Sequence, residues 1–353
     1  MKGIIMKRKI LTILFVVVSL ALISYVAFAD VSKTDVTFET VQPATQLAGL
    51  LRDKIDAIND EIDQKSLNVG TGNIYYVDSA VGSDTYTGTK KAWATATLDA
   101  AIGLCTEDNG DVIYVMQGHN ESLTAADGVD CDVSGVTIIG LGHGSLMPTF
   151  DYDAAAGVFV IGADNVTIVG LRFRTSYNAV VNAIDIEDGV DYTYIINCQF
   201  GFAETATDEF NDAINFGDAS NYGLVQGCYF DAGLQAAVSA IYLDYDSIGT
   251  IIQDCTIMGD YSTANIVGDT TLSQNLIIRR NLLWNGGTND TGTEPCIEML
   301  TGTSAIICDN YIVCNLATKA ASIVCDKALL FENYYNEDLT GTGGLIGTVS
   351  ADD

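Results

Sequence analysis

A short pattern of apolar positions recurs along the last two thirds of this chain. Each copy has an aliphatic residue, a bend and an anchor residue that is Leu, Cys or Asn. The residue two positions after the anchor is mostly large and apolar. The steps between successive anchors are 30, 27, 30, 27, 26, 29 and 23 residues. The anchors are Leu141, Leu171, Cys198, Cys228, Cys255, Asn281, Asn310 and Asn333. A period in this range indicates stacked supersecondary units.

The position three residues before the anchor is aliphatic in all eight copies, so we expect it in the core. Between anchors, a second segment alternates apolar and mostly polar residues, as in Ala183–Ile186 and Ala213–Phe216. No helix-length periodic run lies between the copies. The pattern therefore predicts short strands, separated by Gly, Asp and Asn turns, that stack in parallel about 4.8 Å apart.

These repeats resemble the right-handed parallel β-helix of the pectate-lyase-like superfamily. The anchor column Cys198, Cys228, Cys255, Asn281, Asn310 and Asn333 resembles the internal turn ladder of that family. A second match runs from Tyr75-Tyr76-Val77-Asp78 through Leu98–Ile102 to Gly110–Val115, and it resembles an entry strand, a capping helix and a first coil. The resemblance covers about residues 73–340 and implies an all-β solenoid of about 8–10 coils. This fold hosts lyases, hydrolases, epimerases and structural proteins, so it does not fix an activity.

The N-terminal region has a different character. Residues 1–29 have four basic residues, an apolar run and Ala27-Phe28-Ala29, which predicts a cleaved signal peptide; an uncleaved membrane anchor is the alternative. Residues 30–72 are predicted to hold a tether and a short amphipathic helix, either an oligomerisation stalk or a helix folded against the solenoid. Residues 73–353 form the predicted β-helix domain, with Ala94–Cys105 as its capping helix. No cap is visible in the sequence at the other end, which favours end-to-end stacking of molecules.

The net charge limits the classes of partner that the protein can bind. The chain has a formal charge of −30, and loss of the signal peptide would leave 12 basic against 46 acidic residues, a charge of −34. Nucleic acids and anionic membranes would be repelled, and so would uronic-acid polysaccharides unless a cation bridged them. We therefore expect a secreted or cell-surface protein that contacts no nucleic acid and, once the signal is removed, no membrane.

Nine cysteines in an exported chain need an explanation. Cys198, Cys228 and Cys255 occupy one column on consecutive coils, within disulfide reach of one another, so one pair among them could bridge. Buried free thiols, stacked like the asparagines that replace them, are the favoured alternative. The cysteine spacing matches no zinc motif.

Candidate chemistry is sparse. His143 lies in a Gly-His-Gly element that resembles one in polygalacturonase-type glycosidases, but the rest of that signature is missing, so backbone geometry is the favoured explanation. Arg172 and Arg174 alternate on one predicted strand and should both face outward. Several tyrosines on neighbouring coils could stack on sugars, although their registers differ. They are Tyr222, Tyr229, Tyr242, Tyr245 and Tyr261.

Carboxylates in or just after the second, alternating segment of the repeats form the remaining candidate site. Asp185, Glu187, Asp188, Asp218, Asp244 and Asp246 are the predicted ligands of a calcium-stabilised ridge; a solvated acidic face is the alternative. Asp185, Glu187, Asp212 and Asp244, with His143, are the candidate catalytic residues, since two such carboxylates could serve as a glycosidase acid and base.

The function predicted from these observations is a secreted, non-catalytic β-helix protein that self-assembles or binds extracellular polysaccharide. The alternative is an enzyme, either a calcium-assisted polysaccharide lyase or a carboxylate-pair glycoside hydrolase. Calcium is the one cofactor that the sequence suggests.

Overall fold

The computed structural model describes residues 72–126, 128–201, 208–268, 273–286, 294–314, 322–336 and 344–346. The predicted signal peptide (1–29) lies outside these ranges. So does the predicted tether and helix (30–72), except for its last residue. Within them, no helix is long and apolar enough to cross a membrane.

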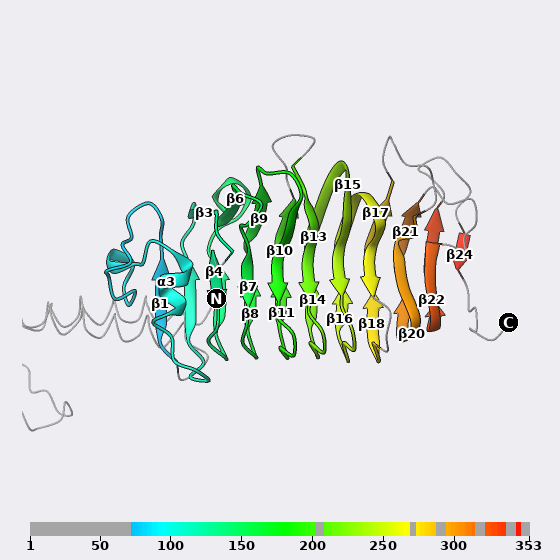
Figure 1. Ribbon diagram of the computed structural model, residues 1–353, viewed down its shortest axis with the longest axis horizontal. Helices are drawn as coiled ribbons and strands as arrows, with labels where there is room; N and C mark the ends of the chain where they lie inside the picture. Colours follow the sequence, from blue (N-terminus) through cyan, green and yellow to red (C-terminus); the bar gives the residue numbers. More distant parts are fainter. Residues whose placement is uncertain are drawn as a thin grey trace, which may run out of the picture. The chain divides into compact units, whose positions relative to one another are not determined.

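The described strands form a parallel β-helix whose coils succeed one another along the long axis of Figure 1. Each full coil supplies one strand to each of three stacks, and every strand pairs in register with its counterparts on the neighbouring coils. The all-β solenoid predicted from the sequence is confirmed. Over the described residues the three stacks hold ten, nine and eight strands.

The strands of each stack have the following bounds. The first stack consists of β1 (Ile74–Val77), β2 (Val112–Val115), β5 (Thr137–Gly140), β8 (Thr167–Val169), β11 (Tyr194–Ile196), β14 (Leu224–Gln226), β16 (Ile251–Gln253), β18 (Leu276–Arg279) and the second halves of β20 (Ile297–Cys308) and β22 (Ile323–Phe331). The second consists of β3 (Asn120–Leu123), β6 (Thr149–Tyr152), β9 (Arg172–Thr175), β12 (Gln199–Gly201), the first parts of β15 (Tyr229–Leu243) and β17 (Thr256–Gly268), β19 (Leu282–Asn285), β21 (Tyr311–Cys314) and β23 (Asn333–Asn336). The third consists of β4 (Val129–Cys131), β7 (Phe159–Ile161), β10 (Val180–Ile186), β13 (Phe210–Phe216) and the remaining parts of β15, β17, β20 and β22.

A short helix covers the N-terminal end of the core. Helix α3 (Leu98–Ile102) buries Leu98, Ala101 and Ile102, as expected of a capping helix, but it is shorter than the predicted Ala94–Cys105. Its start is set by Thr97, an extended residue whose side chain accepts a hydrogen bond from the Ala100 N–H at 3.3 Å. The preceding residues instead form the 3-10 turn η1 (Lys91–Trp93).

A buried histidine–glutamate pair fastens this cap to the first coil. The Glu121 Oε2 atom accepts hydrogen bonds from the Leu98 N–H at 2.9 Å and from His119 Nε2 at 3.0 Å. The other ring nitrogen of His119 accepts from the Ser79 N–H at 3.0 Å. Helix α3, the loop after β1 and strand β3 therefore meet at one buried polar junction.

The core is built from repeated columns. The aliphatic column predicted before the anchors is buried, with Ile138, Ile168 and Ile195 fully inaccessible. In the second stack, phenylalanines lie face to face on consecutive coils. The ring centroids of Phe200 and Phe230 are 4.7 Å apart and their planes differ by 7°. Equivalent side chains of successive repeats therefore stack on one another, and this stacking fixes the register between neighbouring coils.

The anchor column lies inside the solenoid. Asn310 donates from Nδ2 to the Ile278 carbonyl at 2.9 Å and to Asn333 Oδ1 at 3.0 Å, and it accepts from the N–H and the Nδ2 of Asn281. Asn281 in turn accepts from the Cys255 N–H at 2.9 Å. These asparagines therefore satisfy buried backbone groups at each turn.

The cysteines that precede the asparagines in this column are free thiols, as are all nine cysteines of the chain. Cys255 donates from Sγ to the Gln253 carbonyl at 3.2 Å, and Cys228 makes the equivalent contact with Gln226. Burial raises the pKa of the Cys228 thiol well above its usual range. These thiols serve as small buried side chains.

The residue before the anchor has a left-handed backbone in seven of the eight copies, with φ between 54° and 70°. These residues are Gly170, Asn197, Gly227, Asp254, Arg280, Asp309 and Glu332. The bend expected from the sequence is thus a single left-handed residue between the first and second stacks.

The C-terminal end differs from the expectation of unpaired parallel strands. Strand β24 (Gly344–Ile346) pairs antiparallel with β23, with Tyr334 opposite Leu345. The last strand of the second stack therefore has a partner from its own chain.

Candidate glycan-binding face

The second stack presents two columns of outward side chains along the solenoid. From β9 onward they correspond to the first and third residues after each anchor, because the second residue points into the core. The first column is Arg172, Gln199, Tyr229, Thr256, Leu282, Tyr311 and Tyr334. The second is Asp151, Arg174, Gly201, Asp231, Met258, Trp284 and Val313.

The N-terminal part of this face is polar and internally paired. Arg174 and Asp151 form an ion pair with two contacts, Nε to Oδ1 at 2.5 Å and Nη2 to Oδ2 at 2.9 Å. Arg172 donates to Gln199 Oε1 at 3.0 and 3.1 Å and to the Gly144 carbonyl at 2.8 Å. Both arginines face outward around a buried Phe173, as predicted.

The C-terminal part is aromatic and exposed. Trp284, Tyr311 and Tyr334 are 41%, 46% and 52% exposed, and Leu282 beside them is 37% exposed. We call these four residues the aromatic strip. They lie on three successive coils, and neighbouring coils are about 4.8 Å apart. The first of these coils holds Leu282 and Trp284 side by side in the two columns, and the next two hold Tyr311 and Tyr334 in the first column, so the strip is an exposed, mostly aromatic surface.

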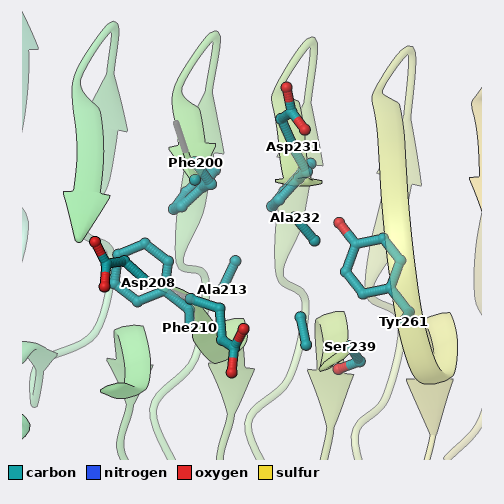
Figure 2. Close-up of a pocket in the computed structure, with 12 residues that line it drawn as sticks. Phe200, Asp208, Phe210, Ala213, Asp231, Ala232, Ser239 and Tyr261 are labelled. Carbon is teal, nitrogen blue, oxygen red and sulfur yellow. The ribbon is translucent and has the colours of Figure 1, made fainter. Parts of the chain in front are cut away.

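An acidic hollow, in which Asp208, Glu209 and Asp231 lie among apolar residues, adjoins the same face, where the second stack turns into the third. Among the residues labelled in Figure 2 are Asp208, just before β13, Phe210 at the start of β13, Asp231 and Ala232 from β15, and Tyr261 from β17. Asp231 also belongs to the outward column that contains Trp284. The hollow and the aromatic strip thus lie along one side of the solenoid.

The carboxyl groups at the hollow are partly removed from water. The Glu209 Oε2 atom is buried and has no hydrogen-bond partner, and burial, followed by the charge of Asp208, raises the pKa of this carboxyl. Just behind the hollow, burial raises the pKa of Asp212 to about 6, while Ser239 donates a 2.5 Å hydrogen bond to it. Burial therefore favours the protonated form of both Glu209 and Asp212.

Three solved structures resemble this fold. A structure entitled rhamnogalacturonan lyase matches with a TM-score of 0.49 and 11% identity, over 69% of this chain and 68% of that one. Two structures of a GH136 lacto-N-biosidase from Eubacterium ramulus match with TM-scores of 0.32 and 0.31, at 11% and 12% identity. They cover 75% and 80% of this chain and 68% and 70% of theirs. No protein-family model and no curated protein sequence gave a significant match.

The carboxylates predicted as calcium ligands are distributed over neighbouring coils. Asp185 Oδ1 accepts from the amides of Asn182 and Asn215 at 3.0 and 2.8 Å, and Asp188 Oδ1 accepts from the Asp218 N–H at 2.9 Å. Within the described ranges, no group of three or more His, Cys, Asp or Glu side chains is placed to hold a metal ion. The calcium ridge stays a prediction from the sequence.

The structure distributes the candidate catalytic residues over several coils. The register places Asp185 opposite Asn215 and Asp212 opposite Asn182, so a carboxylate alternates with an amide on adjacent coils. Glu187 and Asp246 are exposed in turns, and Asp244 is half-buried at the end of the third stack. Among these candidates, Asp212 accepts a hydrogen bond from Ser239, and Ser239 lines the hollow.

His143 is exposed in the turn before the 3-10 segment η2 (Gly144–Leu146) and makes no side-chain capping bond. The glycines on either side have φ values of 129° and 59°. The Gly-His-Gly element therefore supplies a backbone conformation, which was the favoured explanation.

The tyrosines predicted as a sugar-stacking strip do not form one surface. Tyr261 is buried, Tyr222 stacks on Tyr192 in a turn with ring centroids 5.0 Å apart, and Tyr242 lies on the third stack. The aromatic strip was missed, although its signal was present: Leu282, Tyr311 and Tyr334 directly follow the three asparagine anchors.

Proposed function

We propose that this chain is a secreted or cell-surface β-helix protein that binds a neutral polysaccharide along the outer face of its second stack. The observation that supports this most directly is the aromatic strip, where Trp284, Tyr311 and Tyr334 lie exposed on successive coils. An aromatic ring offers a flat apolar surface with little side-chain entropy to lose, and it suits the apolar face of a pyranose ring.

The charge of the protein favours a neutral ligand. With a formal charge of −30, it would repel a polyanion before contact. Asp231 lies in the same outward column as Trp284, two coils before it, and the carboxylate oxygens of Asp231 and of the hollow can accept hydrogen bonds from sugar hydroxyls. At the polar end of the same face, the guanidinium of Arg172 can donate to sugar oxygens. A chain of several sugar units could thus contact aromatic, acidic and basic groups in turn.

A binding experiment tests the proposal. The full-length protein is titrated by isothermal calorimetry with neutral oligosaccharides from β-glucan, xylan and galactomannan, and with oligogalacturonate as the acidic comparator. Trp284→Ala and Tyr311→Ala should each weaken binding of the best neutral ligand about tenfold, or about 1.4 kcal/mol. Tyr177→Ala is the matched control, since Tyr177 is 45% exposed but lies in the turn after β9.

Two results would contradict the proposal. One is binding that Trp284→Ala and Tyr311→Ala leave unchanged. The other is preferential binding of oligogalacturonate in the absence of divalent cations, because that would place the ligand on a surface other than this acidic side.

A second candidate function, glycoside hydrolysis, is favoured by one observation at the hollow. Glu209 has a buried, unpartnered carboxyl oxygen and a raised pKa, as a general acid requires, and Asp208 and Asp231 line the same hollow. Release of reducing ends from the bound oligosaccharide, lost in Glu209→Gln with binding retained, would establish hydrolysis. Binding with no release at all would leave the protein a non-catalytic receptor.

A further inference from the structure

The outer face of the first stack is unusually apolar for so acidic a protein. One outward column follows the solenoid from its second coil as Val112, Thr137, Thr167, Tyr194, Leu224, Ile251, Ile277, Ile306 and Leu329. The parallel column beside it begins Tyr76, Tyr114, Ile139, Val169 and Ile196. Most of these side chains are partly exposed, and Leu329 is 60% exposed.

No strand segment of this stack contains an aspartate or glutamate in the part of the chain that the structure describes. The other two stacks differ in this respect. The second has Asp151 and Asp231 on its outer side, and the third has Asp185, Asp212 and Glu298. Two molecules that meet through the centre of the first stack therefore bring fewer carboxylates together than on the other faces, and the exposed Asp254, Asp309 and Glu332 lie just past the ends of its strands.

Three polar side chains on this face have hydrogen-bond partners within it. Gln253 donates from Nε2 to Gln226 Oε1 at 3.0 Å, and Arg279 donates from Nε to Gln253 Oε1 at 2.9 Å. Covering the face would consequently leave few new polar groups without hydrogen bonds. Most of its outward positions are aliphatic or aromatic, so its removal from water is favourable.

The area of the face is sufficient for a dimer. Nine spacings of about 4.8 Å give a length of about 43 Å, and three to four residues at about 3.3 Å each give a width of about 10–13 Å. Face-to-face contact would then bury about 430–560 Å² per molecule, or about 900–1,100 Å² in total. That lies at the lower limit for a specific interface, which predicts a dimer of modest affinity.

From these observations we infer that two copies of this chain associate laterally, first stack against first stack. The strands of the stack are already hydrogen-bonded on both sides along the solenoid, so contact is through side chains and does not add strands to a sheet edge. This arrangement leaves the second stack, and with it the proposed glycan-binding face, open in both copies.

Sedimentation equilibrium of the full-length protein tests the inference. We expect a monomer–dimer equilibrium that strengthens with added salt, because salt screens the repulsion between two acidic bodies and leaves the apolar contact intact. Ile251→Glu and Ile277→Lys, both outward near the middle of the face, should each weaken the dimer at least tenfold. The control is Val181→Glu, since Val181 is 60% exposed on β10 in the third stack.

The opposite signs of the two introduced charges distinguish contact between two copies of this face from contact with an acidic surface. Both variants should weaken the dimer if the face meets its own copy, and Ile277→Lys should weaken it less than Ile251→Glu because both molecules are acidic. A tighter dimer with Ile277→Lys would indicate contact with an acidic surface and overturn the inference. A wild-type protein that is monomeric at about 100 μM, or a dimer that neither variant weakens, would overturn it too. Circular dichroism establishes that each variant is folded, and the salt dependence of the wild type tests the contact without any substitution.

Discussion

Replacing one asparagine of the internal ladder should destabilise the solenoid strongly. Asn310 is fully buried, and its amide links three coils. In Asn310→Ala the Ile278 carbonyl and the Asn281 N–H lose their partners in a place that water does not reach. Asn333 Oδ1 keeps the hydrogen bond from the backbone N–H of residue 310 at 3.2 Å.

The loss in free energy of unfolding can be estimated from these two backbone groups that lose their hydrogen-bond partners. A buried backbone group without a partner costs about 1–3 kcal/mol, so Asn310→Ala should lower the free energy of unfolding by about 2–6 kcal/mol. Asn310→Cys should cost roughly half as much. Its thiol can donate to the Ile278 carbonyl in the way that Cys255 donates to the Val225 carbonyl at 3.6 Å, but it is a weak acceptor for the Asn281 N–H.

Urea unfolding followed by circular dichroism measures these differences. Asn120→Ala is the control, since Asn120 is an exposed asparagine in β3 and its loss should change the free energy of unfolding by less than about 0.5 kcal/mol. Two results would refute the assignment of these hydrogen bonds as stabilising. One is an Asn310→Ala variant as stable as the control, and the other is an Asn310→Cys variant less stable than Asn310→Ala.

Three further predictions concern the hollow, the cap and calcium. Burial raises the pKa of Asp212 to about 6, above an unfolded value near 3.9, so the folded state holds this proton more tightly and loses stability as pH rises from about 4 to about 6. Asp212→Asn should therefore stabilise the protein by about 2–3 kcal/mol above pH 6 and by much less at pH 4, and equal urea midpoint shifts at both pH values would contradict this. Glu121→Ala leaves the Leu98 N–H and the His119 Nε2–H unpaired, so thermal unfolding should show a loss of about 2–4 kcal/mol, and an unchanged midpoint would argue against a stabilising cap junction. Millimolar calcium should leave the unfolding temperature unchanged, because carboxylates of the predicted ridge already accept hydrogen bonds; a clear rise would support the predicted ligands instead.

The fold was predictable because each coil repeats the same physical requirements. An aliphatic residue three before the anchor, a left-handed residue just before it and a buried hydrogen-bonding anchor recur at nearly constant spacing. The capping helix was predictable from Leu98 and Ile102, but its length depended on the local conformation of Thr97.

The candidate site was less predictable, because exposure on a solenoid depends on which side of a strand each residue occupies. The tyrosines were grouped by sequence proximity, whereas the register separates Tyr229 on the second stack from Tyr242 on the third. Glu209 lies at the junction between β12 and β13, outside the repeated columns, so periodicity gave no information about its burial. The amides that alternate with Asp185 and Asp212 became apparent only from the pairing of β10 with β13.

The most direct test of the account is a crystal structure of the protein with the neutral oligosaccharide that binds best. The account predicts pyranose rings stacked over Trp284 and Tyr311, with sugar hydroxyls directed toward Asp231. An oligosaccharide bound on the first stack, on the third stack or at an end of the solenoid, with the aromatic strip uncovered, would contradict it.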